Sequence, residues 1–195
     1  MKVIGLTGGI AMGKSTVAAA FRRARIPVFD ADAEVHHLQA RGGAAVPAIA
    51  AAFPGTVREG AVDRARLRAS LLADPAGWPV LEAIIHPRIN TARKAFLARN
   101  RRRGARLVVL DIPLLLETEP RPAVDMIVVV SAPRAVQRAR LKRRRRMTPP
   151  EAAAIVARQM PDREKRRRAD RVIETGLSRR YSQAAIRRLI QEIRG

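Results

Sequence analysis

Short apolar runs recur along the chain, and each is followed by a turn signal and a longer, more polar segment. The runs are continuously apolar rather than alternating, which is typical of strands buried on both faces of a parallel sheet. Turn residues such as Gly8-Gly9 and Ile112-Pro113 close them. We therefore predict five strands, at residues 3–6, 26–29, 106–110, 125–130 and 172–173.

The segments between these strands predict helices. Because strands alternate with helices, we expect an α/β fold in which helices cover both faces of a parallel sheet. The helical segments are residues 15–24, 33–40, 44–100 (with breaks at 54–55 and 74–75) and an amphipathic closing helix at 178–193.

Length and composition limit the class of protein. A chain of 195 residues suits a single α/β domain with a small insert. It contains no cysteine, which excludes a disulfide framework and a thiolate metal site. The N-terminus runs straight into the first strand without a secretory segment, and no apolar run approaches the roughly 20 residues of a membrane span. We therefore expect a cytoplasmic protein with no membrane partner. We also expect a monomer.

The formal net charge of +22 predicts attraction to anions such as nucleotides, polyphosphates and nucleic acids. Charge alone does not choose among these ligands. One Trp and one Tyr leave almost no aromatic platforms on which single-stranded bases stack. A nucleic-acid partner is therefore not expected despite the charge.

The most specific motif is the glycine-rich segment of residues 8–15, which fits G-x-x-x-x-G-K-[ST] between a strand and a helix. Glycine permits the backbone angles of such a loop, whose amides then point at phosphates beside the positive end of the helix. Lys14 places a charge by the β- and γ-phosphates, and the Ser15 hydroxyl is a ligand for Mg²⁺. The motif predicts that ATP and Mg²⁺ are the cofactors, bound by Gly8, Gly9, Ala11, Met12, Gly13, Lys14, Ser15 and Thr16.

Acidic residues follow two other predicted strands. Ligands bind at the carboxyl ends of strands in open parallel sheets, so Asp30, Asp32 and Asp111 are candidates. Two roles are open for Asp32: a base that accepts a proton from an acceptor hydroxyl, or the N-cap of the next helix. Asp111 either orients Mg²⁺ through water or is a structural turn residue.

A dense group of arginines precedes Thr148-Pro149. Such a run is often only the solvent-exposed face of a helix. A P-loop kinase, however, must exclude water from its site, and a helical lid with arginines does so while stabilising the transferring phosphoryl group. Arg140 and Arg144 lie one turn apart and share a face.

Taken in order, these motifs resemble the dephospho-CoA kinase family over almost the whole chain. The P-loop, the Ile26–Asp32 segment with its Asp-Ala-Asp, and His86-Pro87 resemble that family's motifs. So do Asp111-Ile112-Pro113-Leu114-Leu115-Leu116-Glu117 and Ala169-Asp170-Arg171-Val172-Ile173.

The resemblance implies ATP-dependent phosphorylation of the ribose 3′-hydroxyl of dephospho-CoA, the last step of coenzyme A biosynthesis. It implies a P-loop NTPase three-layer sandwich with a five-stranded parallel sheet, formed by residues of about 1–32, 104–139 and 169–195. A helical acceptor-binding part would span about 33–100, and a helical lid about 140–160.

The resemblance also implies roles for individual residues. Lys14, Asp32 and Arg140 would be catalytic, with Asp32 as the base, and Arg144 would contact the nucleotide. Asp32, His86, Asp111 and Leu115 would bind the acceptor.

Three positions depart from the family pattern. Met12 replaces a small or hydroxyl residue, and we expect little effect because loop amides still serve. Ile155 replaces a lid arginine, whose role would be lost or pass to Arg158. Thr175 stands where the family often has Asn near the adenine.

Two other classes of function stay open from the residues alone. One is a small-molecule kinase of the same fold that acts on adenylate, shikimate or gluconate. The other is a basic P-loop ATPase that binds nucleic acid, for which affinity would fall steeply with salt. A non-enzymatic anion binder is disfavoured because Lys14 and Ser15 are intact.

Overall fold

The structure is a computed structural model that describes residues 1–119, 122–143, 156–157 and 159–194. The chain forms two compact units, each with its own hydrophobic core. The first unit contains Met1–Phe29 and Asn100–Gly195, and the second is the continuous segment Asp30–Arg99.

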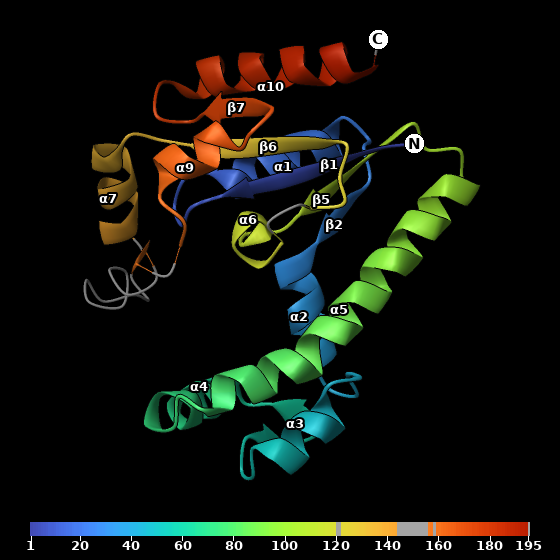
Figure 1. The fold of residues 1–195 in the computed structure, drawn as a ribbon, viewed down its shortest axis with the longest axis vertical. Helices are drawn as coiled ribbons and strands as arrows, with labels where there is room; N and C mark the ends of the chain where they lie inside the picture. Colours follow the sequence, from blue (N-terminus) through green and yellow to red (C-terminus); the bar gives the residue numbers. More distant parts are fainter. Residues whose placement is uncertain (120–121, 144–155, 158, 195) are drawn as a thin grey trace. The chain divides into compact units, whose positions relative to one another are not determined.

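A five-stranded sheet with the order β2-β5-β1-β6-β7 is the centre of the first unit (Figure 1). The central strand β1 (Lys2–Gly8) pairs in parallel with β5 (Leu107–Asp111) and with β6 (Met126–Ser131). β6 also pairs in parallel with β7 (Arg171–Glu174), and β2 (Val28–Asp30) forms the opposite edge. This sheet confirms the predicted parallel α/β fold and all five predicted strands.

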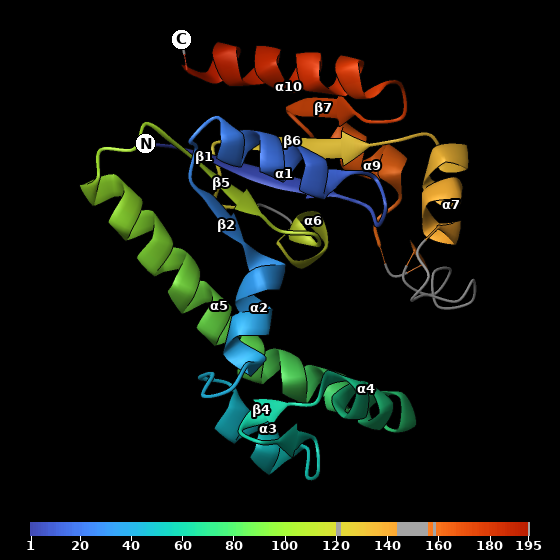
Figure 2. The ribbon, with the colours of Figure 1, turned by 180° about the vertical axis from the view of Figure 1, so that it is seen from behind.

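Helices cover both faces of this sheet. α1 and α10 pack on one face, where their apolar side chains share a core cluster with Ile4 and Leu6 of β1. Figures 1 and 2 view the unit from opposite sides, with α6 and α9 in front of the sheet in the first and α1 in front in the second. The helices of this unit are α1 (Lys14–Arg23), α6 (Leu115–Thr118), α7 (Arg134–Lys142), α9 (Asp162–Arg167) and α10 (Arg179–Arg194).

An exposed ion pair between Arg171 of β7 and Glu192 of α10 joins the edge strand to the closing helix. The hydrogen bond from Arg171 lowers the pKa of Glu192, and the same bond raises the pKa of Arg171. Both groups are therefore charged at neutral pH. The stability that Glu192 contributes is present above its unfolded pKa and is lost as the pH falls through its lower folded pKa.

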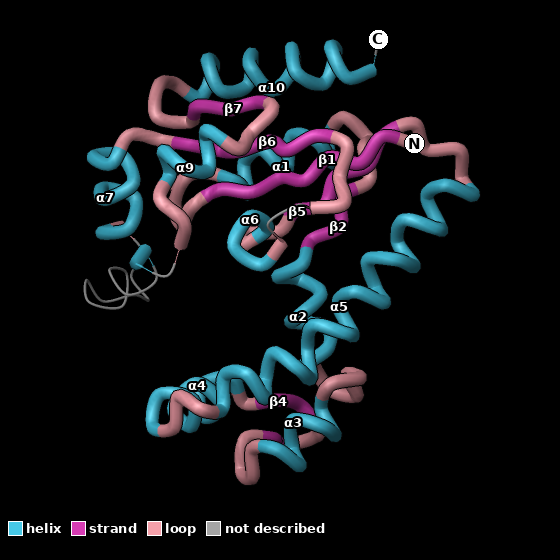
Figure 3. The backbone as a smooth tube through the Cα atoms, in the orientation of Figure 1, coloured by secondary structure: helices cyan, strands magenta, loops and turns pink. Residues whose placement is uncertain are grey.

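The second unit is mostly helical, with a small hairpin that the sequence analysis missed (Figure 3). Residues 44–100 were predicted to be helical apart from two breaks, but β3 (Val57–Arg58) and β4 (Ala61–Val62) pair antiparallel within them. Glu59 and Gly60, at φ of 50° and 76°, make the two-residue turn that such hairpins favour. The helices are α2 (Ala31–Gln39), α3 (Val46–Ala52), α4 (Arg64–Ala73) and α5 (Gly77–Arg102), of which the last continues into the first unit.

Within the described part of the chain, every helix is too short or too polar to cross a lipid bilayer.

Candidate active site

The glycine-rich loop joins β1 to α1 in the geometry that its motif predicts. Gly13 has φ of 96°, in the left-handed region that favours glycine, and is the N-cap of α1. A Cβ atom on Gly13 would lie 2.8 Å from Thr175 Oγ1, and one on Gly8 would lie 2.5 Å from the Val130 carbonyl oxygen. Both positions therefore exclude any larger residue.

Several backbone amides of this loop are available to an anion. Thr16 N donates to the Gly13 carbonyl at 3.0 Å. Among the residues that the structure describes, the amides of Ala11, Gly13, Lys14 and Ser15 have no acceptor. They lie at the N-terminal end of the ten-residue helix α1, whose dipole adds a partial positive charge. This combination suits a polyphosphate.

Lys14 forms an ion pair with Asp111. Its Nζ atom lies 2.5 Å from Asp111 Oδ1, and the exposed fractions of the two side chains are 17% and 3%. The pair forms because Asp111 ends β5, beside Leu6 of the P-loop strand. Asp111 therefore lies at the carboxyl edge of the sheet, as predicted, and holds the lysine of the motif in place.

Arg140 of α7 binds the back of the loop. Its guanidinium donates to the Ala11 carbonyl at 3.2 Å, to Thr175 Oγ1 at 2.9 Å and to the Thr175 carbonyl at 2.5 Å. The Thr175 hydroxyl in turn donates to the Met12 carbonyl. The two residues therefore connect the loop to α7 and to the segment after β7.

Met12 is accommodated at its unusual position. Its side chain is buried, and its sulfur accepts a hydrogen bond from Ala132 N at 3.1 Å. The long side chain therefore fills the space beside the end of β6, while the loop amides keep their arrangement.

Asp30, rather than Asp32, caps α2. Asp30 Oδ1 accepts a hydrogen bond from Ala33 N at 3.0 Å, and Asp32 lies inside the first turn of the helix. The N-cap role that was open for Asp32 is therefore excluded. The carboxylate of Asp32 is solvent-exposed and makes no hydrogen bond or ion pair with any described residue.

The remaining predicted residues differ in their surroundings. His86 is exposed on α5, next to Pro87 within the helix. Leu115 is fully buried, and one of its methyl carbons lies 2.5 Å from where a Cβ atom on Gly5 would stand. This burial does not support the predicted contact between the Leu115 side chain and an acceptor. Arg144, Ile155 and Arg158 lie outside the described residues.

Comparison with known proteins decides the family. The family model described as dephospho-CoA kinase matches residues 2–179. The chain belongs to the dephospho-CoA kinase family. The curated dephospho-CoA kinase of Mesorhizobium japonicum is 51% identical over 195 residues, covering 100% of this chain and 98% of its own. That of Paramagnetospirillum magneticum is 54% identical over 166 residues, covering 85% of this chain and 78% of its own.

A solved structure shares the fold of this chain. The crystal structure of TT1252 from Thermus thermophilus has a TM-score of 0.82 and 34% identity, covering 100% of this chain and 98% of its own. Its likeness covers the residues of both units.

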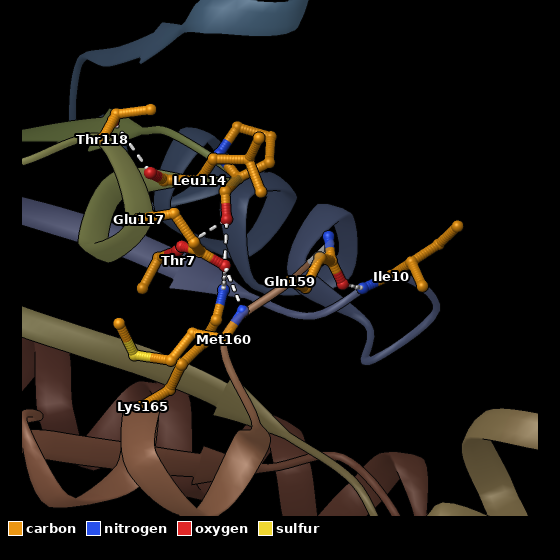
Figure 4. Close-up of polar contacts among 9 residues, drawn as sticks. Thr7, Ile10, Leu114, Glu117, Thr118, Gln159, Met160 and Lys165 are labelled. Carbon is orange, nitrogen blue, oxygen red and sulfur yellow. Dashed lines mark hydrogen bonds and ion pairs between the residues drawn. The ribbon is translucent and has the colours of Figure 1, made fainter. Parts of the chain in front are cut away.

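In this member of the dephospho-CoA kinase family, a buried ion pair beside the P-loop strand was missed from the sequence (Figure 4). Lys165 of α9 and Glu117 of α6 point toward each other, with Lys165 Nζ 2.7 Å from Glu117 Oε1. Glu117 Oε1 also accepts a hydrogen bond from Met160 N at 2.9 Å, whereas Oε2 is buried without a partner among the described residues. Lys165 lies among charged residues at 162–168, and the sequence does not distinguish it from these neighbours.

Replacing Lys165 with methionine is expected to lower the free energy of unfolding by about 3–5 kcal/mol, because it leaves Glu117 charged, buried and unpaired. The Lys165 side chain is only 1% exposed and that of Glu117 only 15%, so water cannot replace the lost partner fully. Urea unfolding of the two proteins measures the difference.

The matched control is the double variant Lys165→Met, Glu117→Gln, which removes the unpaired charge and should recover much of the lost stability. Equal unfolding free energies for the single variant and the unchanged protein would contradict this account of the pair.

Proposed function

We propose that the chain catalyses transfer of the γ-phosphate of ATP to the ribose 3′-hydroxyl of dephospho-CoA, yielding CoA and ADP. The observation that supports nucleotide binding is the loop before α1. Its Gly13 is left-handed, four of its amides have no acceptor among the described residues, and its Lys14 is held by Asp111. The acceptor half rests on the family, whose model matches residues 2–179.

Phosphoryl transfer requires positioning and charge stabilisation more than covalent chemistry. We assign the cradle for the β- and γ-phosphates to the P-loop amides and to Lys14. Arg140 and Arg144 would stabilise charge on the transferring group. In the structure the Arg140 guanidinium binds the back of the loop, so this role would require it to turn toward the phosphates.

Asp32 is our proposed base. Asp30 already caps α2, which leaves the Asp32 carboxylate exposed and without a structural partner among the described residues. A carboxylate in this state can accept the proton of the attacking hydroxyl as the new P–O bond forms. His86, in the second unit, would contribute to acceptor binding.

The residues present fit Mg²⁺. No cluster of three or more His, Cys, Asp or Glu within the described ranges is arranged to hold a metal ion. Mg²⁺ in kinases needs only one or two protein ligands, because phosphates and waters complete its octahedron. Ser15 would hold it and Asp111 would orient it through water; when bound, it would neutralise charge on the β- and γ-phosphates.

We propose a cytoplasmic monomer as the working form. A cytoplasmic location follows from the substrates, both of which are intracellular nucleotides. Size-exclusion chromatography with light scattering tests the monomer.

An assay that couples ADP release to NADH oxidation tests the proposed function. Dephospho-CoA, adenylate, shikimate and gluconate are compared with a reaction that lacks an acceptor, all with ATP and Mg²⁺. We expect ADP release only with dephospho-CoA, with CoA as the second product. Release with another acceptor, or turnover stimulated by RNA or DNA alone, would overturn the assignment.

A further inference from the structure

Two glutamine side chains hold the polar groups of one P-loop residue. Gln159 Oε1 accepts a hydrogen bond from Ile10 N at 2.8 Å, and Gln137 Nε2 donates to the Ile10 carbonyl at 2.9 Å. The side-chain amides of both glutamines lie close to Gly9. A Cβ atom on Gly9 would be 3.4 Å from Gln159 Oε1 and 3.6 Å from Gln137 Nε2. Figure 4 shows Gln159 reaching Ile10 from the segment before α9.

These bonds belong to a series along the outer side of the loop. The carbonyls of three successive residues each accept a hydrogen bond from a side chain outside the loop. The pairs are Ile10 with Gln137, Ala11 with Arg140 and Met12 with Thr175.

The C=O and N–H of one planar trans peptide point in opposite directions. Holding the Ile10 and Met12 carbonyls outward therefore turns the amides of Ala11 and Gly13 toward the other side of the loop. These are two of the amides that have no acceptor among the described residues. Ala11, at φ of 60°, is in a region that costs energy for a residue with a side chain, so its conformation needs such support.

The two glutamines are themselves anchored. Gln137 lies on α7, whereas Gln159 lies just before Met160, whose amide is bound by Glu117. Glu117 is in turn held by the buried Lys165. The backbone next to Gln159 is therefore tied to a buried ion pair.

We propose that Gln137 and Gln159 are positioning residues that pre-organise the P-loop amides for the triphosphate of ATP. The role of these glutamines in turnover rests on the proposed function. Their role in ATP binding does not depend on the acceptor. Pre-organised dipoles stabilise charge without a cost of reorganisation when the ligand arrives. Each acts through the backbone of Ile10.

The first test is the dissociation constant for ATP with Mg²⁺ and no acceptor, measured by titration calorimetry. Gln137→Ala and Gln159→Ala are each expected to weaken ATP binding by about three- to tenfold, the effect of losing one hydrogen bond. Their thermal unfolding midpoints should stay close to that of the unchanged protein. Alanine variants that bind ATP within twofold of the unchanged protein would overturn the proposal.

A second set of variants separates hydrogen bonding from charge. Gln159 acts as an acceptor, so glutamate preserves its bond and lysine does not. Gln137 acts as a donor, so lysine preserves its bond and glutamate does not. The expected result is that Gln137→Glu binds ATP more weakly than Gln159→Glu. Gln137→Lys keeps its bond and adds a positive charge, so it should bind ATP more tightly than the unchanged protein. Gln159→Lys adds the same charge but loses its bond, so it should bind ATP more weakly than Gln137→Lys.

Charge alone predicts a different result, in which both glutamate variants weaken binding equally and both lysine variants strengthen it equally. That result would overturn the proposal. A protein that binds ATP but fails to phosphorylate dephospho-CoA would contradict the proposed function and leave this test intact.

Discussion

Replacing Lys14 with methionine will lower turnover by about 10²–10³-fold, because a positive charge aimed at the transferring phosphoryl group is lost. Methionine keeps an unbranched stem of similar length, so the change removes the charge with little loss of packing. The coupled ADP-release assay at saturating ATP and dephospho-CoA measures turnover. Turnover within tenfold of the unchanged protein would show that Lys14 does not stabilise the transition state.

The ion pair with Asp111 requires a control for folding. Asp111 is 3% exposed, so the methionine variant removes the Lys14 cation from a buried carboxylate. The double variant Lys14→Met, Asp111→Asn removes that charge and should recover stability while turnover stays low. Recovery of stability without activity would show that the loss of turnover does not come from an unstable fold.

Replacing Asp32 with asparagine will lower turnover by about 10²–10⁴-fold and leave ATP affinity nearly unchanged, as expected when a general base is removed. Asparagine has the same shape but accepts no proton, and the helix keeps its N-cap because Asp30 supplies it. Turnover and the ATP dissociation constant, measured on the same preparation, test both parts. Near-normal turnover would exclude Asp32 as the base.

Asp30→Asn is the matched control, because it makes the same chemical change two residues earlier. Asparagine is a good N-cap, so α2 should keep its stability. We expect this variant to retain most of its turnover. A loss as large as that of Asp32→Asn would instead indicate that the two carboxylates act together.

The features that could be predicted from the sequence depend on short stretches of chain. The P-loop is a contiguous motif, and its strand and helix have strong apolar patterns, so Gly13 and Lys14 are found where the motif places them. The sheet was predicted for the same reason. The β3–β4 hairpin was missed because strands of two residues carry too little pattern to be distinguished from a break in a helix.

The features that were missed depend on contacts between distant parts of the chain. Gln159 is 149 residues from Ile10, and nothing in the sequence around it indicates its partner. Lys165 resembles its charged neighbours, and only the fold shows that it is buried against Glu117. The two roles open for Asp32 could be distinguished only by seeing that Asp30 caps the helix.

The strand order has a consequence for the order of synthesis. β1 leaves the ribosome before its partners β5 and β6, which begin only at Leu107 and Met126. The whole second unit, whose core is formed from its own residues, is translated between them. A nascent chain that ends before β5 therefore carries an anion-binding loop on an unpaired strand. β1 is therefore synthesised well before either of the strands that pair with it.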